Sequence, residues 1–453
     1  MSTNRRPPGP RGHRLIGSLP EVRKDALGFL SDCARQYGDV VLYRILNTPA
    51  YLLNRPDLIE EVLIHQYRNF VKGRIYGATR QSFGEGLLTS EGEAWQKQRL
   101  LVQPAFHHER IAAYADLAVM ETCQLMQGWT DHQTLDIYTE MKRLTLQIAS
   151  KSLFSTSLSD QTRLVSQALH VVLEEFNARM NTGLLIPDSI PTPGNLRLNR
   201  AVRRLESIVY QIINERRTEN VDHGDLLSML LNARDVVGRL MTERELRDEV
   251  LTLIIAGHDT TALALSWTFY LLATNPEVEA TLSAELQTQL CGRPPTANDV
   301  PRLRFAEMVI KESLRLYPTA WGISRVALND CDIGGYFIPA RSSVVISQWV
   351  TQRDPRYFEA PLDFEPLRWE AEQTKPFPKF AYFPFGGGPR RCIGHAFAMM
   401  ETILILAAVA QRFQFRLVPN QVIEPTPSFT LYPKNGIKAV AIKHGVSQDM
   451  PHK

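Results

Sequence analysis

The sequence predicts a mainly helical globular protein that carries a small β region. Two long stretches, 111–181 and 196–217, show apolar residues at the spacing of amphipathic helices. A further helical stretch begins with a capping signal at Thr242. Residues that favour strands are concentrated in 40–53 and 331–347. The hydrophobic content of 44% and the charged content of 22% are ordinary for a globular chain, so we expect a packed helical body.

The composition limits the partners and the compartment of the protein. The net charge of +3 gives no case for nucleic-acid binding, which requires a strongly basic stripe. The five cysteines are widely spaced, which disfavours a disulfide framework and suits a reducing cytoplasm. The N-terminal residues contain no apolar run, so we expect no signal peptide and no membrane anchor. We expect one domain over 1–453, with a proline-rich arm at 1–20 and a polar tail at 444–453.

The N-terminal part of the chain alternates between turn-rich and regular segments. Glycine and proline dominate 7–20, helical spacing follows over 22–37, and a strand pair covers 40–53. A helix over 56–63 precedes the glycine-rich segment 71–90. By composition alone, this last segment is a surface loop.

The next helix, over 93–103, carries the first candidate site residues. Trp95 and Arg99 are four residues apart and therefore lie on one face. The indole N–H and the guanidinium are donors without an acceptor, so together they suit a carboxylate. The alternative is a core tryptophan beside a surface arginine.

The long helix after Thr242 contains an unusual polar stretch. A glutamate three residues after Thr242 completes a capping box, and Asn275-Pro276 ends the helix. Residues 256–261 read Ala-Gly-His-Asp-Thr-Thr. The Thr260 hydroxyl can donate to the Ala256 carbonyl and weaken the helical ladder, which opens a groove for water or dioxygen. The alternative is a helix kink with incidental polar residues.

The segment 385–394, Phe-Gly-Gly-Gly-Pro-Arg-Arg-Cys-Ile-Gly, places Cys392 between a glycine-rich turn and the apolar run 396–410. This run predicts a buried helix whose free N–H groups lie near the sulfur and favour a thiolate. The glycines remove Cβ atoms that would keep a flat cofactor away from the backbone. This pattern fits a cysteine sulfur that binds the metal of a large planar cofactor such as heme. A buried structural cysteine is the alternative, and zinc is disfavoured because no other cysteine lies near Cys392.

Five positions here, Phe385, Gly388, Arg390, Cys392 and Gly394, match the pattern Phe-x-x-Gly-x-Arg-x-Cys-x-Gly. The sequence thereby resembles the cytochrome P-450 family, and matching segments in the expected order extend the resemblance over nearly the whole chain. The resemblance implies the P-450 fold, a helical prism that encloses heme b, with Cys392 as the iron ligand. The other cofactor-binding residues that it implies are Trp95, Arg99, Ala256, Arg325, Phe385, Gly386 and Arg390.

The same resemblance assigns roles to three further sets of residues. Asp259 and Thr260 are the implied catalytic pair, which relays protons during dioxygen activation. Glu312 and Arg315, together with Arg368, are expected to form a buried charged cluster behind the heme, which is a structural role. The segment 71–90 is expected to cover one side of a substrate pocket.

The implied function is that of a soluble, bacterial-type monooxygenase, which hydroxylates or epoxidises a hydrophobic small molecule such as a fatty acid or a terpenoid with dioxygen. The chain shows no dinucleotide motif and no flavin domain, so we expect electrons from a separate acidic ferredoxin or flavodoxin with its reductase. The basic residues expected around its docking site are Lys97, Arg302, Arg304, Lys379 and Arg391. We expect a cytoplasmic monomer. A peroxide-using peroxygenase or isomerase and a non-catalytic heme-binding sensor are the alternatives.

Overall fold

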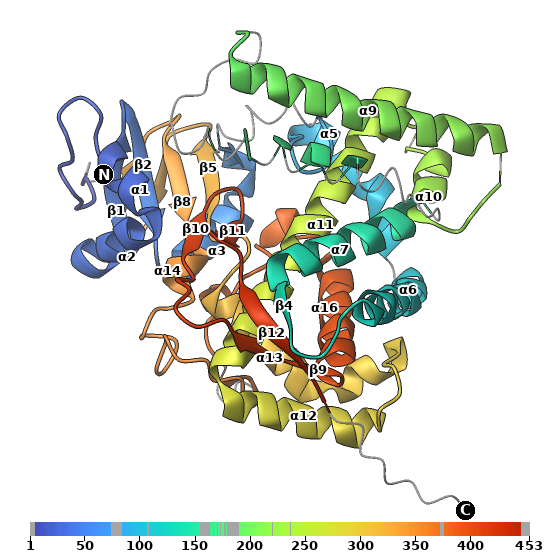
Figure 1. Cartoon of the computed structure of the whole chain (residues 1–453). Coiled ribbons are helices and arrows are strands. Elements are labelled where there is room, and N and C mark those ends of the chain that lie inside the picture. Colours follow the sequence, from blue (N-terminus) through green and yellow to red (C-terminus); the bar gives the residue numbers. More distant parts are fainter. Residues whose placement is uncertain are drawn as a thin grey trace, which may run out of the picture.

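The computed structural model describes residues 5–73, 84–106, 108–154, 190–219, 221–235, 237–371 and 376–444, together with scattered residues between 164 and 178. Helices form most of the body, and the largest group of strands lies to one side of it, next to the N-terminus (Figure 1). This is the mainly helical arrangement with a small β region that the sequence predicts. Part of the expected pocket segment, 74–83, lies outside the described residues, as do 1–4 of the arm and 445–453 of the tail.

The helices range from single turns to the long α11. The longer helices are α2 (Ala26–Tyr37), α5 (Gly92–Val102), α6 (His108–Gln127), α7 (Ile137–Phe154), α9 (Pro193–Glu219), α11 (Glu243–Thr274), α12 (Pro276–Leu290), α13 (Arg304–Leu316) and α16 (His395–Ala410). The short helices are α1 (Leu19–Lys24), α3 (Pro56–Glu60), α10 (Leu226–Asn232), α14 (Gln348–Thr351) and α15 (Arg368–Ala371). Further single turns are Glu61–His65, Tyr67–Asn69, Gln103–Phe106, Ala297–Arg302, Lys379–Ala381 and Gly388–Arg390.

The strands form one larger sheet and several small ones. The larger sheet has the order β1-β2-β8-β5-β3 and is antiparallel except between β2 and β8. Its strands are β1 (Val40–Ile45), β2 (Thr48–Leu53), β3 (Phe70–Lys72), β5 (Ile323–Ala327) and β8 (Ser343–Ile346). The small sheets contain β4 (Gln133–Asp136), β6 (Cys331–Ile333), β7 (Tyr336–Ile338), β9 (Phe413–Leu417), β10 (Pro425–Pro427), β11 (Leu431–Pro433) and β12 (Lys438–Lys443).

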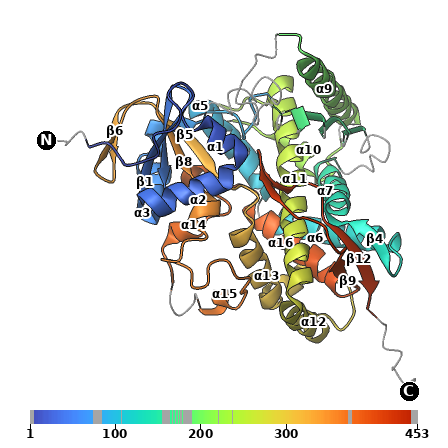
Figure 2. The ribbon, with the colours of Figure 1, turned by 60° about the vertical axis from the view of Figure 1, so that its left-hand side comes forward.

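The helix α11 is the centre of the fold and contacts α7, α9, α13 and α16. Figure 2 shows it crossing the helical body with α16 beside it. The predicted capping box forms, since Thr242 Oγ1 accepts from Glu245 N at 3.2 Å and Glu245 Oε2 accepts from Thr242 N at 2.8 Å. Among the described residues, α11 alone has the length and apolar composition to cross a membrane. Because 83% of its apolar window is buried inside the protein, these properties are also those of a core helix.

Two elements differ from the sequence prediction. The helix expected over 22–37 divides at Asp25, whose carboxylate caps α2 by accepting from Gly28 N at 2.9 Å. The helical stretch expected over 111–181 is interrupted by β4, which pairs with β12 near the C-terminus through the register Leu135 to Ala439. This pairing joins distant parts of the chain, so periodicity within 111–181 carries no sign of it.

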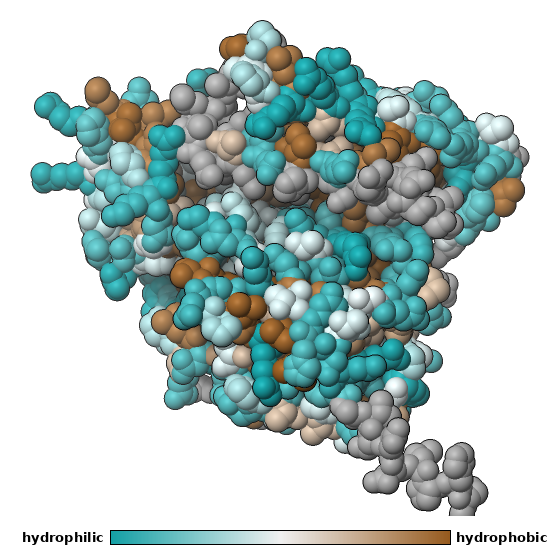
Figure 3. Space-filling model, viewed as in Figure 1, coloured by the Kyte–Doolittle hydropathy of each residue, from teal (hydrophilic) through white to brown (hydrophobic). Residues whose placement is uncertain are grey.

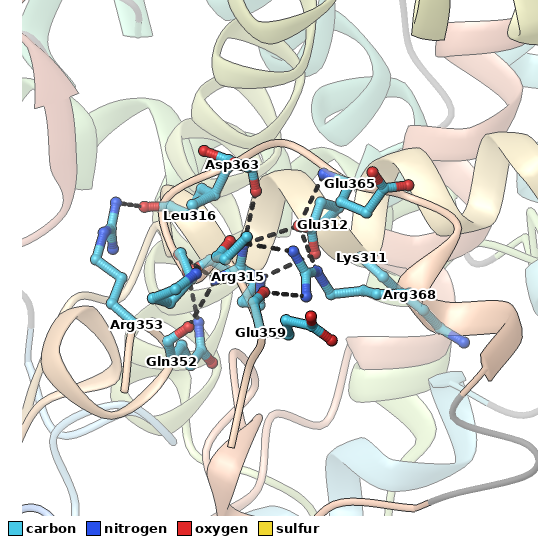
Figure 4. A network of polar contacts seen from close by, with 12 residues as sticks. Lys311, Glu312, Arg315, Leu316, Gln352, Arg353, Glu359, Asp363, Glu365 and Arg368 are labelled. Atoms are coloured by element: carbon cyan, nitrogen blue, oxygen red, sulfur yellow. Dashed lines mark hydrogen bonds and ion pairs between the residues drawn. The ribbon is translucent and has the colours of Figure 1, made fainter. Parts of the chain in front are cut away.

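The expected charged cluster forms between α13 and α15, with Glu312 and Arg315 fully buried and Arg368 12% exposed. Glu312 accepts from Arg315 Nε and Nη2 at 2.9 and 2.8 Å and from Arg368 Nε at 2.8 Å. The same carboxylate accepts from Trp369 Nε1 at 3.0 Å and from Glu365 N at 3.1 Å. Arg315 also donates to the carbonyls of the chain that follows α14 (Figure 4). The cluster therefore fastens a long irregular segment to the helical core.

The surface is mostly hydrophilic on the face that Figure 3 displays. The brown, hydrophobic residues on this face are interspersed with polar ones. Isolated exposed apolar residues of this kind are normal on a globular protein. The large apolar side chains instead fill the core around α11, α13 and α16.

Candidate active site

Cys392 lies in a tight loop directly before α16. Backbone bonds from Cys392 N to Phe385 O and from Arg391 N to Gly388 O, both at 3.0 Å, close this loop. The rings of Phe385 and His395 meet edge to face, with their centroids 5.1 Å apart. The helix begins at His395, as the apolar run predicts. The loop therefore presents the sulfur from a defined backbone.

The groups around the Cys392 sulfur have opposing effects on the pKa of its thiol. Burial raises the pKa of the thiol, whereas a hydrogen bond from Gly394 N–H and the charges of Arg99 and Arg391 lower it. The Cys392 side chain is nevertheless exposed. A residue that is desolvated and yet uncovered faces an open space enclosed by the protein. This donor from the start of α16 is the one that the sequence predicts.

Two of the three glycines before Cys392 are also required by the packing of the loop itself. A Cβ added to Gly387 would collide with the ring of Phe380, and one added to Gly388 would collide with the Leu63 carbonyl oxygen. Gly386 and Gly388 also have φ values of +69° and +66°, which favour glycine. Of the three, only Gly386 has no protein atom in close contact with a Cβ position.

Three residues in the middle of α11, Ala256, Gly257 and Thr260, keep exposed surface, and we call them the uncovered strip. Ala256 is exposed and Gly257 and Thr260 are half-buried, although the residues before and after them are almost all buried. Thr260 Oγ1 donates to Ala256 O at 2.6 Å, as predicted. The helix continues without a break through this bond. A central helix that is uncovered at its midpoint borders an internal space.

Asp259, the neighbour of Thr260, is buried and faces other elements. Its Oδ1 accepts from Tyr138 on α7 at 2.9 Å, and its Oδ2 accepts from Thr430, just before β11, at 2.8 Å. The preceding residue, His258, is also buried and lies 3.2 Å from Thr145 Oγ1 through its Nδ1. Burial lowers the pKa of His258 to about 4, so its ring is neutral near pH 7. The structure therefore separates Asp259 from the uncovered strip on which Thr260 lies.

Several cationic side chains converge beside the Cys392 loop. The Arg390 guanidinium lies 4.0 Å from the ring centroid of Trp95 and pairs with Glu91. The Arg99 guanidinium lies 6.0 Å from the same ring. The pKa of Arg390 is lowered to about 10, mainly by burial. The positive charges of Arg325 and Arg99 lower this pKa further, whereas the negative charge of Glu91 raises it. The structure thus brings together four of the residues expected to bind the cofactor, Trp95, Arg99, Arg325 and Arg390, with more positive than negative charge.

Comparison with known proteins identifies the family. The model of the cytochrome P450 family matches residues 7–440. The chain belongs to the cytochrome P450 family. Among its relatives is cyclooctat-9-en-7-ol 5-monooxygenase of Streptomyces melanosporofaciens, which is 38% identical over 90% of this chain and 88% of the relative. Cyclooctatin synthase of the same organism is 37% identical over 93% of this chain and 92% of its own length. Pentalenene oxygenase of Streptomyces avermitilis is 33% identical over 92% of this chain and 93% of its own length.

As a P450, the protein is an oxidoreductase of the monooxygenase type that uses heme b. The described residues fit this cofactor. Cys392 offers one uncovered sulfur with a backbone donor beside it. The cations around Trp95 match the two carboxylates of heme b, because guanidinium groups are the preferred partners of carboxylates. The uncovered strip of α11 leaves room for a planar group.

Sequence reasoning did not find every residue that shapes this site. Glu91 holds Arg390 in place, and Trp369 donates to the buried Glu312. Tyr138 reaches Asp259 from a position 121 residues away. Thr430, just before β11, donates its hydroxyl to Asp259. No spacing in the sequence signals these contacts, because each depends on how distant elements pack.

Proposed function

We propose that this P450 hydroxylates or epoxidises a hydrophobic small molecule of the terpenoid class, with dioxygen and with electrons from a separate redox protein. One observation carries the proposal: Cys392 and the α11 residues Ala256, Gly257 and Thr260 keep exposed surface although they belong to the interior. A thiolate on one element and a hydroxyl on the central helix, each next to open space, are the protein groups that heme-thiolate oxygenation requires.

In the proposed site, Cys392 holds the heme iron, and the heme supplies dioxygen activation, for which a thiolate ligand favours O–O cleavage. The Gly394 N–H stabilises the negative charge of the sulfur. Trp95, Arg99, Arg325 and Arg390 bind the carboxylates of the cofactor, and Phe385, Gly386 and Ala256 lie against it. Thr260 holds a proton at Oγ1, which it donates to the Ala256 carbonyl in this structure, and Asp259 resupplies that proton.

The terpenoid class follows from the relatives and not from the geometry. Two relatives are named for cyclooctat-9-en-7-ol and for pentalenene; both names contain the -en- of a carbon–carbon double bond, and the first also carries the -ol of a single hydroxyl group. Among the hydrophobic classes that the sequence leaves open, we therefore favour a cyclic terpenoid over a fatty acid. A spin-state titration of the purified holoenzyme with both classes, followed by the heme absorption band, tests this choice. A larger response to fatty acids would overturn it.

We also propose that an acidic ferredoxin or flavodoxin delivers the electrons to a basic surface around the Cys392 loop. Arg391 and Arg304 are exposed, as this requires. Lys97 is a weaker candidate, because its ammonium lies 3.2 Å from Asp235 and 3.4 Å from Glu245 and its charge is already compensated. The reduction rate should fall as salt rises, since charge attraction governs such encounters. A rate independent of salt would contradict this docking mode.

Replacement of Thr260 tests the catalytic proposal directly. We expect Thr260→Ala to keep heme content but to release more peroxide per electron pair, because the hydroxyl proton is lost. Thr260→Ser keeps the hydroxyl and is the matched control. The measurement is the ratio of product to NADPH consumed, with a ferredoxin, its reductase and the compound that gives the largest spin shift. An unchanged ratio in the alanine variant would remove Thr260 from the mechanism, and full turnover with peroxide alone would favour a peroxygenase.

A further inference from the structure

The carboxylate of Asp259 is held by two hydroxyl groups from elements far apart in the sequence. Tyr138 lies in the first turn of α7 and donates to Oδ1 at 2.9 Å. Thr430 lies immediately before β11 and donates to Oδ2 at 2.8 Å. Asp259 and Thr430 are 4% and 8% exposed, whereas Tyr138 is half-buried. Tyr138 is therefore the most exposed member of this group.

The chemistry of these partners is suited to moving a proton. A hydroxyl group donates one hydrogen bond and can accept others, so it can take a proton on its oxygen while it passes its own hydrogen on. A guanidinium in the same place has no acceptor and would not release a proton at ordinary pH. Burial and the neighbouring Asp259 charge raise the pKa of Tyr138, which keeps its hydroxyl protonated and donating.

Within the part of the chain that the structure describes, the charged and titratable groups around Asp259 are few and do not provide another route. His258 is neutral near pH 7 because burial lowers its pKa to about 4. The Lys142 ammonium lies 4.4 Å from the centre of the Tyr138 ring and so approaches its face, not Asp259. Tyr432 and Asp136 act on Tyr138 only through their charge. Of the groups described around Asp259, the two hydroxyls are the ones bonded to it.

The position of Asp259 relative to Thr260 sets the direction in which a proton would travel through these residues. Thr260 belongs to the uncovered strip of α11, whereas Asp259 is buried against α7 and the segment before β11. The two side chains are adjacent on the helix and about 100° apart around it. Asp259 thus lies between the half-buried Tyr138 on one side of α11 and the internal space on the other.

We propose that Tyr138 and Thr430 are positioning residues that hold Asp259 as an oriented carboxylate, and that protons enter the site from the α7 side through Tyr138. This inference rests on the proposed function. In the step that we infer, a solvent hydronium ion gives a proton to the Tyr138 oxygen and leaves as water, while the Tyr138 hydroxyl hydrogen passes to Asp259 Oδ1. The neutral Asp259 then turns from its partners toward Thr260 and delivers that proton. One proton moves and no electron does.

The test compares Tyr138→Phe and Thr430→Val with Thr430→Ser in the holoenzyme. Tyr138→Phe removes one hydroxyl at constant ring size, Thr430→Val removes the other at constant shape, and Thr430→Ser keeps it. Each variant is supplied with a ferredoxin, its reductase, NADPH and the terpenoid of largest spin shift. The measurements are product per NADPH, peroxide release, the solvent deuterium isotope effect and the pH profile. The ferrous CO spectrum shows whether each variant retains the heme-thiolate centre.

We expect Tyr138→Phe to lower coupled turnover about tenfold, the factor that corresponds to one hydrogen bond to a charged group. Its solvent isotope effect and pH profile should change, which a purely structural role would not cause. Thr430→Val should lose coupling to a smaller extent, and Thr430→Ser should match the wild type. If Tyr138→Phe fails to retain heme, Thr430→Val against Thr430→Ser provides the same comparison.

Two results would overturn the inference, and they differ from a failure of the proposed function. The first is that Tyr138→Phe and Thr430→Val both keep the coupling, isotope effect and pH profile of the wild type while Asp259→Asn is impaired. This result would show that protons reach Asp259 by another route. Wild-type behaviour of Asp259→Asn itself would remove the acid that these residues position. If the wild-type enzyme itself formed no product, the proposed function would fail, and this inference with it.

Discussion

The buried cluster around Glu312 offers the sharpest test of the energetics of this fold. Glu312 and Arg315 are each 0% exposed, and the Glu312 carboxylate accepts five hydrogen bonds. In Glu312→Gln the shape is kept, but the amide nitrogen must replace one oxygen. At the Oε2 position it would face Arg315 Nε and Trp369 Nε1, and at the Oε1 position it would face three donors. Either choice leaves donors unsatisfied and a buried guanidinium without an anion.

We expect this substitution to lower the free energy of unfolding by about 3–5 kcal/mol, the usual cost of leaving a buried charge unpaired. The matched control is Glu307→Gln on the same helix, because Glu307 is 42% exposed and pairs with Lys311 at the surface. A surface pair of this kind contributes at most about 1 kcal/mol. The assay is urea unfolding of the holoenzyme followed by tryptophan fluorescence and by the heme absorption band.

Glu312→Gln should therefore lower the free energy of unfolding much more than Glu307→Gln does. If both shifted the unfolding free energy by less than about 1 kcal/mol, the five hydrogen bonds would not carry the energy assigned to them. Replacing both Glu312 and Arg315 by Met should not restore stability. Arg315 also donates to the carbonyls of Gln352, Pro361 and Asp363, which would lose their partner.

Two further substitutions test the site and its supporting helix. Gly388→Ala should reduce the ratio of heme to protein, because its Cβ would meet the Leu63 carbonyl oxygen; Gly292→Ala, where φ is also positive but the space is open, should keep it. Glu401→Gln should flatten the pH dependence of stability. Burial raises the pKa of Glu401 to about 8 against the opposing Thr261 hydrogen bond, so its stabilising contribution is present below about pH 4.5 and lost as pH rises through 8. Thermal unfolding at pH 5 and pH 9 measures this, and equal changes in variant and wild type would contradict it.

Features that depend on neighbouring residues could be predicted well from the sequence. The capping box at Thr242, the strand pair over 40–53 and the hydrogen bond from Thr260 to Ala256 all form. Each joins residues of one helical turn or of one β-hairpin, so the local sequence contains the whole interaction. The start of α16 beside Cys392 belongs to the same group.

The arrangement of the candidate site was only partly predictable. The family pattern placed Trp95, Arg99, Arg325 and Arg390 near one another, and the structure brings them together. For Gly387 and Gly388 the structure adds a packing requirement that the sequence did not indicate, because Phe380 and Leu63 lie where their side chains would be. Spacing within the segment does not reveal which distant atoms fill that space.

The amino-acid sequence by itself determined the family, and it predicted the thiolate ligand and the acid and alcohol pair on α11, since each of these motifs consists of residues close together in the chain. The tertiary structure alone decided that Asp259 turns away from Thr260 to bind Tyr138 and Thr430, and that β4 joins β12. The physical reason is that a hydrogen bond acts over about 3 Å in space. Packing of the helices, and not separation along the chain, sets which polar groups come within that distance.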